Sequence, residues 1–279
     1  MMLEVRMDMV RAAAQGRLSL PSVPRVVRRL IGQLRDPGAS VLDVVDELEQ
    51  EPQLAARTLR IANSPYYCGR RSVASLRDAV MVVGTNTLRT LVISGGLEAV
   101  FVAVPGVNLR QFWLDATITA KAARSLARLA GADAEAAFLA GLLHNVGHLI
   151  LCQGFADRLP PALAGARSAR GRELARIEQD ICGMDHAQVS AAWLDELGFP
   201  ESVVDAVAHH LDPGGAGGPL APLLGLATQL AASIEAGDSA RIAVHKLDAG
   251  WVAAASLLAD RLDEELAVQY EQIAAGGEA

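Results

Sequence analysis

Apolar residues recur at helical spacing along most of this chain, and almost no segment shows the two-residue alternation of a β-strand. Only Val80–Val83 has the β-branched run of a short strand, and it fits a buried helical turn equally well. Hydrophobic residues make up 51% of the sequence and aromatic residues only 4%. The apolar mass is therefore Ala, Val and Leu, which favours helices. We expect an all-α protein.

Prolines, glycines and capping residues divide the chain into helical segments. In the first part we expect helices over Pro24–Leu34, Ser40–Glu49, Pro52–Asn63, Leu76–Gly84 and Asn86–Val102. Asn63 is expected to end its helix in the left-handed conformation, which asparagine tolerates. In the second part we expect helices over Leu109–Ala130, from Asp133 past Val146, over Asp185–Gly198 and Pro200–His210, and over two final segments.

Pro105 and Gly106 interrupt the helical pattern, and we place a subdomain boundary beside them. The expected division is an N-terminal helical subdomain over 1–108, a second helical subdomain over 109–232 and a C-terminal helical extension over 233–279. The Arg-rich stretch Asp157–Asp180 is expected to hold a loop and one solvated helix.

No feature of the sequence points to a membrane or to secretion. The mean hydropathy is +0.25, but no apolar run reaches about 18 residues without a charge, the length that a spanning helix needs. Glu4, Arg6 and Asp8 interrupt the first apolar stretch, so we expect no signal peptide and a cytoplasmic protein. The three cysteines are far apart, which argues against disulfides and against a thiolate zinc site: Cys68, Cys152 and Cys182.

Charge is distributed unevenly along the chain. The net charge is −7, yet residues 1–110 hold 14 Arg against 10 Asp and Glu, and the remainder holds 11 basic against 22 acidic residues. This asymmetry suggests two modules with different surfaces. The basic excess is too small and too dispersed to indicate a nucleic-acid surface, so we expect neither nucleic acid nor a membrane as a partner.

The histidines are the most informative polar residues. His245 stands alone, and the other five lie at or beside expected helix ends: His144, His148, His186, His209 and His210. Histidines from several helices are one way in which a bundle builds an interior metal site. His144 and His148 are four residues apart, on one expected helical face, but Asn145 stands where a metalloprotease needs its glutamate. The adjacent His209 and His210 can share a site only at a helix end that faces a cavity; otherwise one of them caps the helix.

Several segments in order resemble one known family, from about Leu18 to Ala231. Ala136–His148 reads AAFLAGLLHNVGH and is similar to the central segment of the HDOD family, normally AFLAGLLHDIGK. The same family is resembled by Leu20–Pro24 (LPSVP), the Asp-Pro turn at Asp36, Leu59–Tyr67 (LRIANSPYY), the segment beginning at Ser72 (SVASLRDAVMVVGTNTLR), Asp185–Ala191 (DHAQVSA) and the His209-His210 pair.

This resemblance implies a helical bundle packed on a bundle like that of HD-domain phosphohydrolases. Catalytic HD proteins hold one or two metal ions with His and Asp side chains, and a bridging aspartate is central to that site. By position, Asp115 stands here for an expected histidine, Asn145 for the bridging aspartate, His148 for a lysine and Thr228 for a late aspartate. The candidate metal ligands that remain are His144, His186, His209, His210 and Asp115.

We therefore expect a non-catalytic, bacterial-type signal-transduction module that acts through protein partners or by sensing a small molecule or nucleotide. We expect no catalytic residues and no cofactor, with a single divalent transition metal as the alternative state of the site. The main alternative function is a metal-dependent phosphohydrolase or phosphodiesterase acting on a nucleotide or cyclic dinucleotide. Nucleic-acid binding through the Arg-bearing N-terminal half is a third hypothesis.

Overall fold

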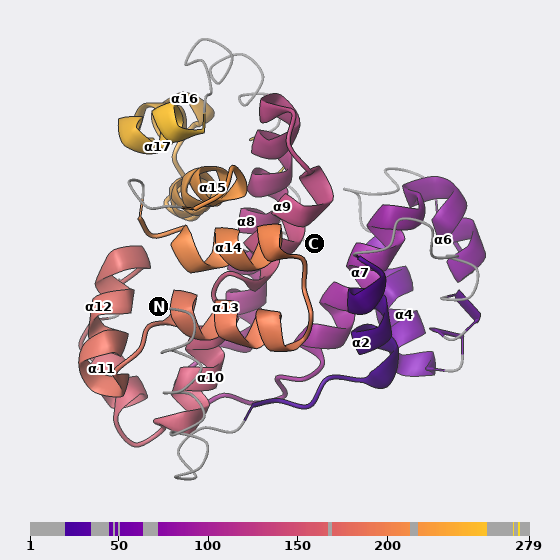
Figure 1. Ribbon diagram of the computed structural model, residues 1–279, viewed down its shortest axis with the longest axis horizontal. Coiled ribbons are helices and arrows are strands. Elements are labelled where there is room, and N and C mark those ends of the chain that lie inside the picture. Colours follow the sequence, from indigo (N-terminus) through magenta and orange to yellow (C-terminus); the bar gives the residue numbers. More distant parts are fainter. Residues whose placement is uncertain are drawn as a thin grey trace.

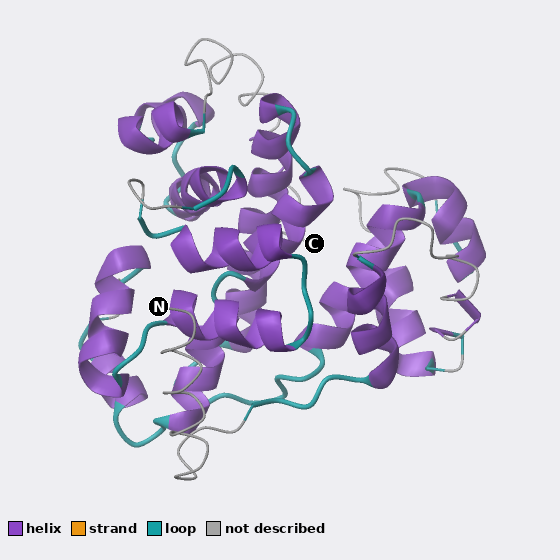
Figure 2. Cartoon of the chain, in the orientation of Figure 1, coloured by secondary structure: helices purple, strands orange, loops and turns teal. Residues whose placement is uncertain are grey.

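The computed structural model describes residues 20–34, 45–46, 48–49, 51–63, 72–166, 169–212, 217–255, 270 and 273. Within this part of the chain the backbone forms helices joined by loops and turns, and it contains no strand (Figure 2). The expectation of an all-α protein is confirmed, and Val80–Val83 is the end of a helix.

The N-terminal helices gather at one side of the molecule, on the right in Figure 1. They are α2 (Arg25–Gln33), α4 (Pro52–Ala62), α6 (Leu76–Val83) and α7 (Thr85–Glu98). α7 is the centre of this group, because α2, α4 and α6 all pack against it and every residue from Leu88 to Leu97 is buried. The predicted apolar face of α2 is buried there, with Val27 lying directly against Gly96 of α7.

The remaining helices form a second, larger group around α8 and α9 (Figure 1). They are α8 (Leu109–Ala130), α9 (Ala134–Leu143), α10 (Val146–Gly154), α11 (Leu159–Ala164), α12 (Gly171–Cys182), α13 (His186–Glu196), α14 (Glu201–His209), α15 (Leu220–Glu235), α16 (Ala240–His245) and α17 (Ala249–Ala254). Gly141 lets α9 approach α8 closely, since a Cβ there would lie 2.7 Å from the Ala120 Cα. α9 also packs against α7 and so joins the two groups.

Most helix bounds agree with the sequence pattern, and the differences are local. α8 has the bounds that were expected, whereas α7 ends at Glu98, before the expected end near Val102. The stretch Asp157–Asp180 contains two helices, α11 and most of α12, where one was expected. The expected helix over Ser40–Glu49 falls largely outside the described residues.

The predicted helix running from Asp133 past Val146 is wrong, because the chain breaks between α9 and α10. Asn145 has φ −111° and ψ 10°, outside the helical region, and separates the two helices. His144 and His148 are therefore not on one helical face, although their spacing suggested it. Because of this break, the side chains of these two histidines lie in different surroundings.

One continuous apolar stretch across this break, Ala134–Gly154, is long and apolar enough by length and composition to cross a membrane. Seventy-two per cent of its most apolar window is buried inside the structure. α9 lies against α8, α14 and α15, and α10 lies against α13. This burial is that of a core element, which satisfies the same length and hydropathy criterion.

Asn63 ends α4, but its backbone is not left-handed as predicted: its φ is −78°. Its side-chain amide instead forms two hydrogen bonds with the backbone of Val73, as a neighbouring β-strand would. Nδ2 donates to the Val73 carbonyl over 2.9 Å, and Oδ1 accepts from the Val73 N–H over 2.8 Å. The amide thus ties the end of α4 to the segment that enters α6, and this bridge explains the need for asparagine better than a conformational preference does.

Replacing Asn63 by alanine should lower the free energy of unfolding by about 1–3 kcal/mol, because it leaves both peptide groups of the half-buried bridge without partners. Urea denaturation measures this loss directly. Asn86 is an exposed asparagine in the first turn of α7, so Asn86→Ala is a matched control that should change stability by less than about 0.5 kcal/mol. Equal effects of the two substitutions would contradict the role of the Asn63 bridge.

Candidate functional site

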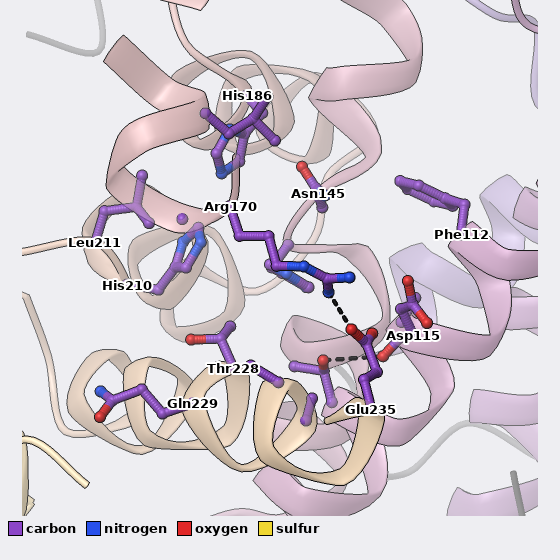
Figure 3. A pocket seen from close by; sticks show the side chains of 17 residues that line it. Phe112, Asp115, Asn145, Arg170, His186, His210, Leu211, Thr228, Gln229 and Glu235 are labelled. Atoms are coloured by element: carbon purple, nitrogen blue, oxygen red, sulfur yellow. Dashed lines mark hydrogen bonds and ion pairs between the residues drawn. The ribbon is translucent and has the colours of Figure 1, made fainter. Parts of the chain in front are cut away.

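A pocket of about 280 Å³ lies where the ends of several helices of the second group meet (Figure 3). Its walls come from α8, the break between α9 and α10, the start of α12, the first residue of α13, the end of α14, and α15. The lining residues are Phe112, Asp115, Ala116, Thr119, His144, Asn145, Arg170, Gly171, Leu174, His186, His210, Leu211, Thr228, Gln229, Ala231, Ala232 and Glu235.

Three of the candidate histidines meet in this pocket, each at a helix end. His144 is the C-cap of α9, His186 is the first residue of α13 and His210 is the C-cap of α14. The ring centroids of His144 and His210 are 5.1 Å apart, and those of His186 and His210 are 5.8 Å apart. The positions of the helix ends therefore bring the three imidazoles together; the spacing of the histidines along the sequence does not.

Asp185 fixes the position of His186 by capping α13. Its carboxylate accepts from the Gln188 N–H over 2.9 Å, and the Gln188 side chain accepts from the Asp185 N–H, which completes a capping box. Asp185→Ala should lower the free energy of unfolding by about 1 kcal/mol, whereas Asp185→Ser should retain most of the stability because serine also caps helices. Thermal denaturation of the two variants distinguishes these outcomes; an equal loss in both would show that the cap contributes little.

The hydrogen bonds at Nδ1 set the chemistry of the three rings. His144 donates from Nδ1 to the Gly141 carbonyl over 2.7 Å, and His210 donates to the Val207 carbonyl over 2.8 Å. Burial lowers the pKa of His144 to about 4 and holds the pKa of His210 well below its ordinary value. Both rings are therefore neutral at pH 7, with the Nε2 lone pair as their remaining polar group.

The third ring, His186, is held by a buried carboxylate that was not among the predicted site residues. Glu178 of α12 is fully buried and accepts from His186 Nδ1 over 2.6 Å, from the His186 N–H over 2.8 Å and from His148 Nδ1 over 2.7 Å. The one available signal was position, because Glu178 lies on the same face of α12 as the buried Leu174 and Ala175.

Glu178 and His148 form a buried ion pair behind the pocket. Burial opposes a charge on His148, but hydrogen bonds with Cys152 and Glu178 outweigh it and raise the pKa of His148 to about 10. Burial likewise opposes the charge on Glu178, but attraction to His186 and hydrogen bonds from both histidines lower the pKa of Glu178 to about 2. His148 thus supplies a positive charge at the position where the family usually has a lysine.

The opposite wall of the pocket carries two carboxylates. Asp115 accepts from Gln111 Nε2 over 2.6 Å, and Glu235 forms an ion pair with Arg170 across the pocket mouth (Figure 3). Burial, together with the hydrogen bond and like charge of Asp115, raises the pKa of Glu235 to about 7 against the opposing charge of Arg170.

The remaining candidate, His209, lies outside the pocket. Its Nδ1 is 2.9 Å from the Asp205 carbonyl and 3.0 Å from Asp205 Oδ1, on the outer side of α14. Of the adjacent pair, His210 is therefore the one that faces the interior. His245, at the end of α16, is exposed and takes no part in the site.

The side chains at the pocket do not fit a two-metal hydrolase centre. Asn145, at the position of the bridging aspartate, has a buried Oδ1 with no hydrogen-bond partner, and Thr228, at the position of the late aspartate, donates its hydroxyl to the Gly225 carbonyl. Among the described residues no three His, Cys, Asp or Glu side chains are grouped so that they could hold a metal ion. The histidines thus lie beside one another without a carboxylate to bridge two cations.

This helical arrangement places the protein in a class of HD-like helical folds. The model of the HDOD domain matches residues 20–213, and the chain belongs to the HDOD family. An uncharacterized protein from Treponema pallidum (strain Nichols) is 25% identical over 195 residues, which are 68% of this chain and 37% of that protein. The chain thus spans little more than a third of the length of this curated relative.

Solved structures support the same fold. A Shewanella amazonensis protein provisionally assigned as a phosphohydrolase has a TM-score of 0.79 and 25% identity, with 97% of each chain covered. A Geobacter sulfurreducens HDOD domain protein of unknown function has a TM-score of 0.78 and 22% identity over 99% of this chain and 98% of that one, which shows the fold alone. A Marinobacter aquaeolei protein provisionally assigned to signal transduction has a TM-score of 0.70 and 26% identity over 93% of this chain and 60% of that one.

Proposed function

We propose that this chain is a non-catalytic regulatory module of signal transduction, which senses a small ligand in the histidine pocket and passes the signal to a protein partner. One observation carries the proposal: the position of the bridging aspartate holds Asn145, whose Oδ1 is buried in the pocket wall without a partner. A neutral amide cannot balance two divalent cations as a carboxylate does. The loss of this group removes hydrolysis while the cavity remains.

The side chains behind the pocket support a retained binding site. The Glu178–His148 pair and the capping box at Asp185 still hold His186 in place, so the pocket has kept its structural support. The provisional assignment of the Marinobacter aquaeolei protein to signal transduction agrees with a regulatory role.

We also propose the organisation and location in which this role is carried out. The N-terminal helical subdomain over 1–108 and the HD-like subdomain over 109–232 form one module, with 233–279 as a helical extension, in the cytoplasm. The α7–α9 contact between the two groups is the natural route by which a ligand in the pocket influences the N-terminal helices. The signal would pass to a protein partner that binds near this contact and responds to a change in it.

A metal-dependent phosphohydrolase is the second candidate, and the convergence of His144, His186 and His210 favours it, as does the provisional phosphohydrolase assignment of the Shewanella amazonensis protein. It would require these three histidines and Asp115 to move closer together, because they are not grouped here so that they could hold a metal ion.

Hydrolysis of bis(p-nitrophenyl) phosphate, a generic phosphodiester, separates the two candidates. The wild-type protein and His144→Ala are each assayed with Mn²⁺, Fe²⁺, Zn²⁺ and Ni²⁺. We expect no turnover above the metal-only background in either protein. Turnover in the wild type that disappears in His144→Ala would reject the non-catalytic function.

A further inference from the structure

The outer face of α2 carries three arginines and a glycine. Arg25, Arg28 and Arg29 are exposed and recur at i, i+3 and i+4, which places them on one face of the helix. Gly32 lies one turn further along the same face and is also exposed. These four residues, here called the α2 stripe, lie opposite the face that packs on α7.

The charge of the α2 stripe lowers the stability of its own helix. α2 contains no acidic residue. Among the described residues, the side chains of Arg25 and Arg28 have no hydrogen-bond or ion-pair partner, and the nearby Glu98 pairs with Arg57 instead. Like charges at i and i+3 repel each other, and positive charges in the first turn of a helix oppose its dipole. No described contact within the chain offsets this cost.

Gly32 also weakens α2, and the fold does not require it. Glycine inside a helix is less favourable than alanine. A Cβ at Gly32 would meet no atom within 4 Å, whereas a Cβ at Gly96 of α7 would lie 2.2 Å from Val27 Cγ2. Packing therefore explains the glycine on the inner helix but not the one on the outer face. An exposed glycine permits the close approach of another backbone, which points to a segment outside this fold.

We propose that the α2 stripe docks an acidic helix of the protein partner, with carboxylates on the arginines and the helix backbone close to Gly32. Arginine matches a carboxylate with two parallel hydrogen bonds. The distance between packed helices depends on the side chains at their contact, so a glycine there brings them closer. This docking surface rests on the proposed regulatory function, whose partner site it identifies. α2 packs on α7, and α7 packs on α9, which ends at the pocket (Figure 1).

The size of the α2 stripe and the charge of the rest of the chain favour an acidic protein segment over nucleic acid. The stripe spans about 10 Å of helix axis, a length that two turns of a partner helix cover. Beyond residue 110 the chain holds 11 basic against 22 acidic residues. The closely spaced phosphates of a duplex would extend past three arginines and be repelled by this acidic excess.

Fluorescence anisotropy with two labelled peptides tests the proposal on the full chain at low salt. The probe is a stapled helical peptide with glutamates at i, i+3 and i+4 on one face, and its matched control has glutamines at those three positions. We expect the glutamate peptide to bind at least tenfold more tightly than the glutamine peptide. Equal binding of the two peptides, or no binding of either, would overturn the proposal. Tighter binding of a random-sequence DNA duplex would assign the surface to nucleic acid and overturn it as well.

Charge-reversal variants locate the binding. Arg25→Glu combined with Arg28→Glu should weaken binding of the glutamate peptide at least tenfold without lowering the midpoint of thermal unfolding, because acids suit the first turn of a helix. Arg128→Glu combined with Arg176→Glu is the matched control, since it changes the net charge equally on exposed arginines of α8 and α12. Its affinity should equal that of the wild type. Equal losses in the two double variants would reveal general charge attraction and overturn the docking site.

Gly32→Gln separates docking from stability. Glutamine favours a helix over glycine, so the midpoint of thermal unfolding should rise, while the added side chain should weaken binding of the glutamate peptide at least fivefold. A Gly32→Gln protein that binds the peptide as tightly as the wild type would overturn the close approach at this residue.

The phosphodiester assay on the same preparation distinguishes the two levels of failure. No preference for the glutamate peptide together with no hydrolysis would remove the docking surface and leave the non-catalytic function standing. Hydrolysis that His144→Ala abolishes would remove the proposed function itself.

Discussion

Replacing Glu178 by glutamine should lower the free energy of unfolding at pH 6 by about 3 kcal/mol, within the range measured when one member of a buried ion pair is removed. The substitution keeps the size of the side chain but leaves the buried His148 imidazolium without its counterion. It also weakens the hold on His186, which donates two hydrogen bonds to the same carboxylate. Urea denaturation gives the difference directly.

The pH dependence of this stability loss identifies the Glu178–His148 ion pair as its cause. The pKa of His148 is raised to about 10, so its contribution to stability is full below pH 6.5 and is lost as pH rises toward 10. The pKa of Glu178 is lowered to about 2, so its contribution is full above pH 4.5 and is lost as pH falls toward 2. The difference between wild type and Glu178→Gln should therefore be largest between pH 4.5 and 6.5 and should shrink at alkaline pH.

Glu173→Gln is the matched control for this experiment. Glu173 lies on the same helix, α12, but is exposed, so its substitution should change stability by less than about 0.5 kcal/mol. A loss in Glu178→Gln no larger than in Glu173→Gln, or one that does not vary with pH, would show that the buried pair does not stabilise the fold.

Replacing Gly147 by alanine should cost about 3 kcal/mol, the upper part of the range for overpacking a dense core. A Cβ at this position would lie 2.3 Å from the His186 carbonyl oxygen and 2.7 Å from the Ser190 backbone nitrogen. These are backbone atoms of α13, which cannot move aside as a flexible side chain can. The Gly147 N–H also donates to Ser190 Oγ over 2.7 Å, a bond that any displacement of α10 would break.

Gly32 supplies the opposite control. It lies inside α2, where an added Cβ would meet no atom within 4 Å. Gly32→Ala should therefore raise stability by up to about 1 kcal/mol through helix propensity alone. Thermal denaturation of the two variants should show shifts of opposite sign, and a stable Gly147→Ala protein would contradict the close approach of α10 and α13.

The sequence pattern predicted the helical class, the family and helices such as α8, because these depend on local periodicity and on caps such as Asp133 and Asp185. It failed where contacts between distant segments decide the structure. His144 and His148 looked like one helical face, but Asn145 breaks the helix and separates them. Gly147 lies at the close contact between α10 and α13, which nothing in its local sequence indicates.

The site was only partly predictable for the same reason. His144, His186, His210 and Asp115 line one pocket, but the pattern could not decide between His209 and His210, because both sit at the end of one helix. Glu178 lies in a stretch that was expected to be solvated. Its role depends on α12 meeting α10 and α13, which no local signal encodes.

The most direct test of a non-catalytic pocket is the metal content of the purified protein, measured by elemental mass spectrometry for wild type and His144→Ala after loading with Mn, Fe, Zn or Ni. We expect no stoichiometric metal in either protein, because among the described residues no three His, Cys, Asp or Glu side chains are grouped so that they could hold a metal ion. A near-stoichiometric transition metal in the wild type that is lost in His144→Ala would contradict the proposed function and favour the hydrolase.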